Sequence, residues 1–308
     1  MWVVLTGGTG GAKLIEGLSY EIDPAELTLI CNTADDFVLH GLNISPDIDT
    51  ILYTLAGLSD SGKGWGIRDD TFAVLEQLGR LGAETWFKLG DKDIATHITR
   101  TRLWRAGLKL SAITETLRNR LGVKAKILPM SNDPIETRVE TSQGEISFQE
   151  YFVKQRWQAE VQNVFYTGAE KSEPAPGVLE AISGAAGIIL CPSNPVTSIG
   201  PILAVPGVRN ALAGVKVPVV GISPIIGVAA ISGPAHKLMA AQGMEPSALG
   251  VAQTYVDFLD KFVIDREDEI CKGKIENLQI QVVVSSIRMS SLADKRRLAR
   301  EVLALVEK

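Results

Sequence analysis

The first thirteen residues constrain the fold of this chain more than any other segment. An apolar run over residues 3–6 is typical of a buried strand, and it breaks into a turn, residues 7–11, that contains four glycines. Apolar residues at helical spacing follow from Ala12. Glycine lets the backbone come close to a bulky anion, and the first amides of a helix have no partner inside it. The sequence therefore predicts a turn that holds a phosphate group; the alternative is a tight turn without a ligand.

This turn departs from two familiar nucleotide-binding patterns. A dinucleotide-binding strand–turn–helix unit needs three spaced glycines and an acidic residue at the end of its second strand. Here Lys13 stands at the third glycine position, and Asn32 follows the second expected strand. A Walker A loop needs a hydroxyl residue after its lysine, whereas Leu14 follows Lys13. A nicotinamide cofactor and a Walker-type site are therefore both disfavoured.

Size and charge narrow the function classes. The chain has 308 residues, enough for one large domain or two small ones. Its net charge of −5 offers no basic excess for broad nucleic-acid binding. No apolar stretch is long enough to cross a bilayer, and no basic leader precedes the first strand. We expect a cytoplasmic protein that binds neither nucleic acid nor membrane, and that holds any anionic substrate through amides, a few basic side chains or a metal.

Apolar strands alternate with helical segments along most of the chain. This alternation is typical of an α/β fold with a mostly parallel sheet and helices on both faces. Residues 69–121 instead contain successive helical patterns, which we interpret as a helical insertion. Residues 135–153 contain two alternating segments around a turn and predict a small antiparallel hairpin. We expect a single α/β domain over residues 1–308 with these two additions. The expected strands of the main sheet are 3–6, 27–31, 124–128, 187–191, 217–222 and 278–284.

Acidic residues gather after the second expected strand. Asp35 and Asp36 follow it directly, where ligands of open parallel sheets bind, so they could hold magnesium or a ribose. The alternative is a solvated turn or a helix cap. Asp47 is explained by the first turn of a helix that begins near Pro46, because an acid there complements the helix dipole. Asp49 lies in an otherwise apolar helix and could bind a metal, accept a proton or bond a sugar hydroxyl.

A third polar cluster follows the expected strand 187–191. Two prolines hold an irregular loop whose small polar side chains could bond a base edge or a phosphate. These side chains are Ser193, Asn194, Thr197 and Ser198. Elsewhere, Lys88 could reach a phosphate, and Trp65 could be a stacking platform, a lid or a loop anchor. We expect His97 to be simply packed or solvated, with a phosphate contact as the alternative.

Several segments together resemble the 2-phospho-L-lactate transferases of coenzyme F420 biosynthesis. They are residues 7–14, 44–50, 88–91, 148–150, 192–202 and 223–227, and the resemblance extends to about residue 268. It implies a Rossmann-like fold with a helical addition, a magnesium-dependent enzyme and a homodimer. Enzymes of this family transfer a phospholactyl group from lactyl-2-diphospho-5′-guanosine to the ribityl hydroxyl of 7,8-didemethyl-8-hydroxy-5-deazariboflavin (Fo), and they release GMP.

The resemblance also implies roles for individual residues. The diphosphate would be held by Gly8, Thr9, Gly10 and Lys13, and the guanylate by Ser193, Asn194, Thr197 and Ser198. Asp49 and Lys88 match positions that the family uses for Fo, and we add Trp65 there. Asp49 and Asp36 are the candidate catalytic residues and magnesium ligands, with the identity of any general base left open. Asp35 stands where the family often has glutamate, so it is not assigned as a ligand.

Two questions stay open at this point. Relatives of the same superfamily resemble non-enzymatic regulators that bind nucleotide sugars, but they lack the motifs around Pro46 and Pro192 in this form. Those motifs favour the transferase. The sequence leaves open whether lactate, phosphoenolpyruvate or glycerate is the transferred acid.

Overall fold

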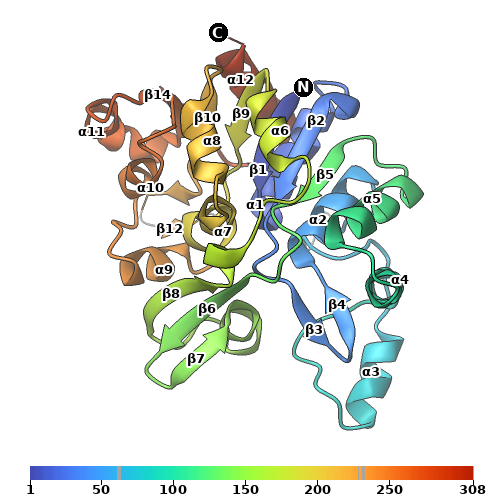
Figure 1. Cartoon of the computed structure of the whole chain (residues 1–308). Helices are drawn as coiled ribbons and strands as arrows, with labels where there is room; N and C mark the ends of the chain where they lie inside the picture. The colour runs from blue at the N-terminus through green and yellow to red at the C-terminus, as the bar shows by residue number, and fades with distance from the viewer. Residues whose placement is uncertain (61–63, 228, 231–232, 308) are drawn as a thin grey trace.

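A seven-stranded parallel sheet forms the centre of the computed structural model, which describes residues 1–60, 64–227, 229–230 and 233–307 (Figure 1). Its strands are β1 (Trp2–Thr6), β2 (Leu27–Cys31), β5 (Lys126–Pro129), β9 (Gly187–Leu190), β10 (Val219–Ile222), β13 (Lys261–Ile264) and β14 (Gln281–Val284). They lie in the order β14-β13-β10-β9-β1-β2-β5. The direction of winding reverses between β1 and β9, which is the arrangement of a doubly wound sheet. Ligands of such sheets bind outside the carboxyl ends of the strands at this reversal.

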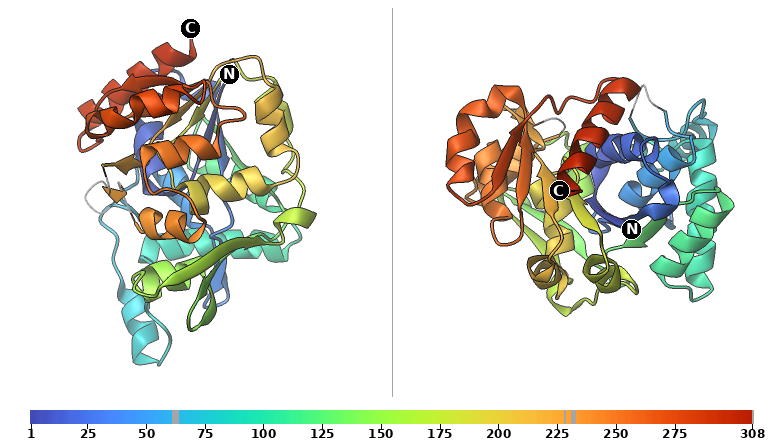
Figure 2. Two further views of the ribbon diagram at one scale, coloured as in Figure 1. Left: turned by 90° about the vertical axis from the view of Figure 1, so that its left-hand side faces the viewer. Right: turned by 90° about the horizontal axis from the view of Figure 1, so that it is seen from above.

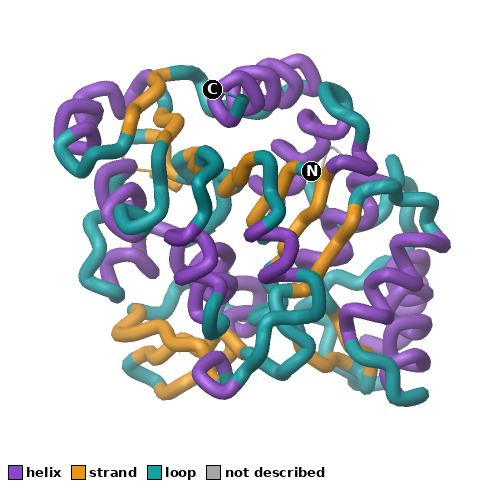
Figure 3. The backbone as a smooth tube through the Cα atoms, turned by 45° about the horizontal axis from the view of Figure 1, so that its top comes forward, coloured by secondary structure: helices purple, strands orange, loops and turns teal. Residues whose placement is uncertain are grey.

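Helices cover both faces of this sheet (Figures 2 and 3). Successive strand residues point to opposite faces, and in β1 the side chains of Val3 and Leu5 join one buried apolar cluster while Val4 joins the other. The Val4 side packs against α1 (Gly8–Ser19), α2 (Pro46–Leu55), α5 (Leu110–Arg120) and α12 (Leu292–Val306). The Val3 side packs against α6 (Val178–Ser183), α7 (Gly200–Ala204), α8 (Val208–Gly214), α9 (Ala235–Ala241), α10 (Ala248–Thr254) and α11 (Lys272–Glu276). Burial on both faces explains why these strands are apolar throughout.

Two additions lie at the end of the sheet where the strands terminate (Figure 1). One is helical, with α3 (Ala73–Arg80) and α4 (Asp91–Arg105), beside the short hairpin β3 (Phe37–Leu39) and β4 (Leu42–Ile44), and α5 leads from it onto the face of the sheet. The other is an antiparallel sheet of β6 (Glu136–Thr141), β7 (Gly144–Ser147) and β8 (Val161–Thr167). The remaining elements are the two-residue strands β11 (Ile225–Ile226) and β12 (Ala229–Ala230) and the short helical turns η1 (Pro24–Glu26), η2 (Glu150–Lys154), η3 (Ala169–Lys171), η4 (Pro195–Ile199) and η5 (Arg266–Cys271).

The predicted fold class is confirmed, with local differences. All six predicted strands of the main sheet are present, but β13 was not predicted. It has four residues and only Asp260 separates it from the apolar pair Phe258 and Leu259, so it lacks a clear start in the sequence. The predicted hairpin is wrong beyond Ser147, because Glu150–Lys154 is helical and the third strand β8 completes the small sheet. No helix among the described residues is long and apolar enough to cross a membrane.

Candidate functional site

A cavity of about 400 Å³ lies at the carboxyl ends of β1 and β9, where the winding of the sheet reverses. Its wall is formed by the turns after β1 and β9, the start of α2, residues of α4, and the segment around η2. Of the predicted site residues, those that line it are Gly8, Thr9, Gly10, Asp49, Trp65, Lys88, Ser193, Asn194, Thr197 and Ser198. The fold therefore brings together most residues that the sequence singled out in separate segments. Lys13 and Asp36 do not line the cavity.

The glycine turn begins the helix earlier than the apolar pattern indicates. Helix α1 starts at Gly8, whose amide bonds the side chain of Asp47. The next two residues, Thr9 and Gly10, line the cavity with the first turn of the helix. Gly8 has a φ of +68°, which glycine adopts at little cost. A Cβ atom on Gly10 would lie 2.5 Å from the carbonyl oxygen of Pro192. The turns after β1 and β9 thus approach each other to a distance that only glycine permits at this position.

Hydrogen bonds hold these two turns together. The hydroxyl of Ser193 donates to the carbonyl oxygen of Gly7 at 2.7 Å. The side-chain oxygen of Asn194 accepts from the amides of Val196 and Thr197 at 2.9 and 3.4 Å and so begins the turn η4. Part of the hydrogen-bonding capacity predicted for ligands is therefore used by the loop itself. The cavity wall still receives the polar atoms of this loop, next to the start of α1.

The buried side chain of Asn32 connects two carboxylates at the same edge. Its amide group donates to Asp35 at 3.1 Å, to Asp47 at 2.9 Å and to the carbonyl oxygen of Thr197 at 3.1 Å. Asp47 also accepts from the amide of Gly8 at 2.8 Å. Asp47 therefore has a role beyond the first turn of its helix: it links α2 to the glycine turn. Asp35 and Asp47 both line the cavity, and together they form what we call the acid pair.

Burial makes ionisation of the acid pair unfavourable. It raises the pKa of Asp47 to about 6, although the hydrogen bonds from Asn32 and Gly8 favour the charged form. Burial, and then the negative charge of Asp47, raise the pKa of Asp35 well above its usual value. Oδ1 of Asp35 is buried, and a contact with the Thr137 hydroxyl favours the charged form of this carboxyl without lowering its pKa to the usual value. Two desolvated carboxylates that accept from one amide group are suited to share a proton or a cation.

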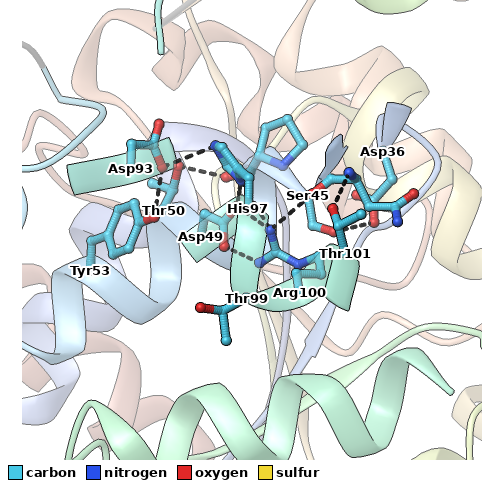
Figure 4. A network of polar contacts seen from close by, with 12 residues as sticks. Asp36, Ser45, Asp49, Thr50, Tyr53, Asp93, His97, Thr99, Arg100 and Thr101 are labelled. Atoms are coloured by element: carbon cyan, nitrogen blue, oxygen red, sulfur yellow. Dashed lines mark hydrogen bonds and ion pairs between the residues drawn. The ribbon is translucent and has the colours of Figure 1, made fainter. Parts of the chain in front are cut away.

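A second polar cluster connects α2 with α4 (Figure 4). The guanidinium of Arg100 bonds both carboxylate oxygens of Asp49, with 3.0 Å between Nη1 and Oδ2. The His97 ring lies between two acids, with Nδ1 3.6 Å from Asp49 and Nε2 3.2 Å from Asp93. The Tyr53 hydroxyl donates to Asp93 at 2.6 Å. Burial raises the pKa of Asp93, but His97, Tyr53 and Arg100 together hold it below its usual range.

Among the described residues, Asp49, Asp93 and His97 offer ligand atoms within 4.8 Å of one another, so they could hold a metal ion. The neighbouring guanidinium already supplies Asp49 with a positive charge, because Arg100 is buried and bonded to both of its oxygens. The acid pair offers carboxylate oxygens alone, whereas this cluster includes an imidazole nitrogen.

Asp36 is placed differently from its neighbour Asp35. Its carboxylate accepts a hydrogen bond from the Ser45 hydroxyl at 2.6 Å, and burial raises its pKa well above the usual value. It faces the start of α2 and is absent from the cavity lining. The sequence alone cannot distinguish these adjacent acids, because their directions depend on the turn that follows β2.

Aromatic side chains form the wall near η2. The rings of Phe148 and Phe152 stack with centroids 5.4 Å apart and line the cavity. Trp157 stacks on the far side of Phe152 at 5.2 Å. At the end of η2, Lys154 bonds Glu84 at 2.8 Å and so joins this segment to the helical insertion. Such a wall is suited to a flat aromatic ligand.

Sequence reasoning missed Asp93 and Arg100 and gave His97 no certain role. Their positions 93, 97 and 100 are spaced to lie on one face of a helix. That spacing could have drawn attention to them, but Asp49, which they face, is in another helix.

Known proteins resemble this chain over nearly its whole length. The family model described as 2-phospho-L-lactate transferase CofD matches residues 2–301. A phosphoenolpyruvate transferase of Streptomyces griseus is 46% identical over 99% of this chain and 98% of its own length. A 2-phospho-L-lactate transferase of Methanosarcina mazei is 43% identical over 98% of this chain and 99% of its own length. A crystal structure of a upf0052 family protein from Bacillus halodurans has a TM-score of 0.66 at 18% identity, covering 98% of both chains, which shows a shared fold.

Proposed function

The chain belongs to the 2-phospho-L-lactate transferase CofD family, and on this premise we propose that it transfers a phospho-three-carbon acid from a guanylated donor to Fo. The donor is lactyl-2-diphospho-5′-guanosine or its phosphoenolpyruvate or glycerate counterpart, and GMP is released. The observation that supports this most directly is the shared cavity. The start of α1, the acid pair, Asp49 and the aromatic wall all face it.

The donor diphosphate would lie against the start of α1. Helix N-termini attract phosphate through free amides and the helix dipole. Thr9 and Gly10 line the cavity there, and Ser193 and Ser198 complete this side from the turn after β9. The guanylate would extend along that turn past Asn194. The predicted contact of Lys13 stays a prediction, since this residue is outside the lining.

Two observations support magnesium at the acid pair. Asp35 and Asp47 accept hydrogen bonds from the same amide group of Asn32, so their carboxylates lie close together. Both carboxylates also line the cavity where the anionic diphosphate would bind. Two carboxylates and a diphosphate repel one another at this distance unless a cation lies between them. Asp35 and Asp47 would hold the ion, which would neutralise charge on the diphosphate. The pair predicted from the sequence, Asp36 and Asp49, remains an alternative.

The acceptor would bind with its ring at the aromatic wall and its ribityl chain toward Asp49. Its terminal hydroxyl attacks the phosphorus that bears the acid, and a new P–O bond forms while the bond to the bridging oxygen of GMP breaks. The hydroxyl proton passes to solvent, and GMP leaves as its phosphate anion. Alignment and charge neutralisation supply most of the acceleration in such a transfer. Asp49 accepts the hydrogen bond of the attacking hydroxyl, and Lys88 lies at the cavity wall to contact Fo.

A mass-spectrometric assay tests this function. The protein is incubated with Fo, magnesium and each of the three guanylated acids in turn. We expect one donor to yield Fo enlarged by its phospho-acid, together with GMP. No product from any donor, combined with thermal stabilisation by UDP-N-acetylglucosamine but not by GDP or Fo, would favour the regulator instead. The homodimer and the cytoplasmic location also stay predictions, and sedimentation measures the former.

A further inference from the structure

One face of α4 is directed at Asp49. Asp93, His97 and Arg100 lie at positions i, i+4 and i+7 of this helix, and their side chains meet Asp49 and Tyr53 of α2 (Figure 4). Helix α4 belongs to the insertion, whereas α2 packs on the main sheet. The surroundings of Asp49 are therefore set by an element outside the core of the fold.

The cluster has a cavity side and a rear side. Asp49, Asp93 and His97 line the cavity, but Arg100 does not, and it is 1% exposed. The guanidinium thus binds the carboxylate of Asp49 from behind and leaves it at the cavity wall. Because each carboxylate oxygen has more than one acceptor site, Asp49 can still accept a hydrogen bond from a ligand.

The hydrogen bonds of the cluster have a defined direction. A guanidinium only donates, so Nδ1 of His97, 3.2 Å from Nη1 of Arg100, is the acceptor nitrogen. Nε2 of the ring is 3.2 Å from Asp93, a close contact rather than an aligned hydrogen bond. Asp93 accepts from Tyr53. Close contacts therefore run from Tyr53 to Asp49, and we expect a change at Asp93 to alter the orientation of the His97 ring.

We propose that Asp93, His97 and Arg100 are positioning residues for the acceptor substrate: they hold the carboxylate of Asp49 in the orientation in which it accepts the attacking hydroxyl. This inference rests on the proposed function. In this proposal the cluster orients the acceptor alcohol, and it binds neither a metal ion nor the guanylated donor.

Kinetic parameters of conservative variants test this assignment. Asp93→Asn and His97→Gln keep the size of the side chains but weaken the chain of contacts. We expect kcat/KM for Fo to fall roughly 10- to 100-fold, as small misplacements of reacting groups do. The KM for the guanylated donor and the magnesium concentration for half-maximal rate should stay within about twofold. Arg100→Lys should retain more activity than Arg100→Met, because it keeps a positive charge.

Thr99→Ala is the matched control. This residue is half-buried on the same helix, where its hydroxyl donates to the carbonyl oxygen of Ala95. It should behave as wild type. Thermal unfolding of each variant distinguishes a misoriented Asp49 from an unfolded protein. If the Arg100 variants do not fold, the kinetics of Asp93→Asn test the proposal.

Two outcomes would overturn the assignment. A large rise in the magnesium requirement of Asp93→Asn or His97→Gln would place a metal in the cluster, and unchanged kinetics would show that Asp49 needs no such support. If the wild-type protein transfers nothing, the proposed function fails by itself. Fo binding, followed by its absorbance, then decides the inference: weaker binding in the variants supports it, and equal or absent binding overturns it.

Discussion

The carboxylate of Asp49 and the guanidinium of Arg100 form a buried ion pair that joins α2 to α4 through two hydrogen bonds. Their side chains are 6% and 1% exposed. Removing one partner of a buried pair leaves an uncompensated charge and typically costs about 3–5 kcal/mol. We expect Arg100→Met to lower the free energy of unfolding by this amount, measured by urea denaturation.

Replacing both partners should be far less harmful. The double variant Asp49→Leu/Arg100→Met removes both charges, and apolar residues of similar volume often substitute for such pairs without loss. Denaturation of the wild type, both single variants and the double variant measures the coupling energy. Strictly additive losses would contradict a direct interaction between the two side chains.

Gly10 is expected to tolerate no side chain. A Cβ atom there would meet the backbone oxygen of Pro192 at 2.5 Å, and backbone cannot yield as a flexible side chain does. Gly10→Ala should separate the turns after β1 and β9, cost about 1–3 kcal/mol of stability and weaken GDP binding at least tenfold. Calorimetry measures both quantities. Gly214→Ala is the control, since its Cβ would meet nothing within 4 Å, and it should bind GDP like the wild type.

The raised pKa of Asp47 should make the stability of the folded protein depend on pH. Burial raises its pKa from 3.8 to about 6. Between these values the folded protein keeps a proton that the unfolded chain has lost, so stability from this group is present at low pH and is lost as the pH rises through 6. The loss is on the order of 2–3 kcal/mol. Without divalent cations, Asp47→Asn should therefore gain stability relative to wild type between pH 4 and pH 7.5.

Denaturant titrations at several pH values measure this difference. Glu170→Gln, which alters an exposed carboxylate, serves as the control and should follow the wild-type profile. A difference between wild type and Asp47→Asn that is the same at every pH would show that Asp47 titrates as it does in the unfolded chain.

The two adjacent acids after β2 should respond differently to magnesium. Asp35 lines the cavity, and its neighbour Asp36 bonds Ser45 instead. Asp35→Asn is expected to raise the magnesium concentration for half-maximal rate at least tenfold, because a carboxylate ligand is lost. Asp36→Asn should change it less than threefold. The reverse order would place the ion at the pair predicted from the sequence.

The aromatic wall should contribute to acceptor binding alone. Phe152 lines the cavity and stacks on Phe148. Aromatic contacts of this kind are worth about 0.5–1.5 kcal/mol beyond area burial, so Phe152→Leu should raise the KM for Fo up to about tenfold. The KM for the donor should not change. Trp157→Leu is the control behind this ring, outside the lining, and an effect as large as that of Phe152→Leu would argue for general destabilisation.

Local sequence patterns were sufficient for the fold class and for much of the cavity wall. The glycine turn, the acid cluster after β2 and the proline-bounded loop after β9 each follow a strand, and the carboxyl ends of parallel strands meet at one edge. That rule needs no tertiary information beyond the parallel sheet. Most predicted site residues therefore line the same cavity.

Contacts between segments far apart in the sequence determine the remaining features of the site, which are the directions and partners of its side chains. Asp47 was explained by its own helix, but its bonds to Gly8 and Asn32 come from two other segments. The partners of Asp49 lie about 50 positions away on α4, and their spacing resembles that of any helix face. A residue's sequence neighbours specify its secondary structure and approximate location. The direction of its side chain and the charge beside it depend on which elements pack together, and only the tertiary structure shows that.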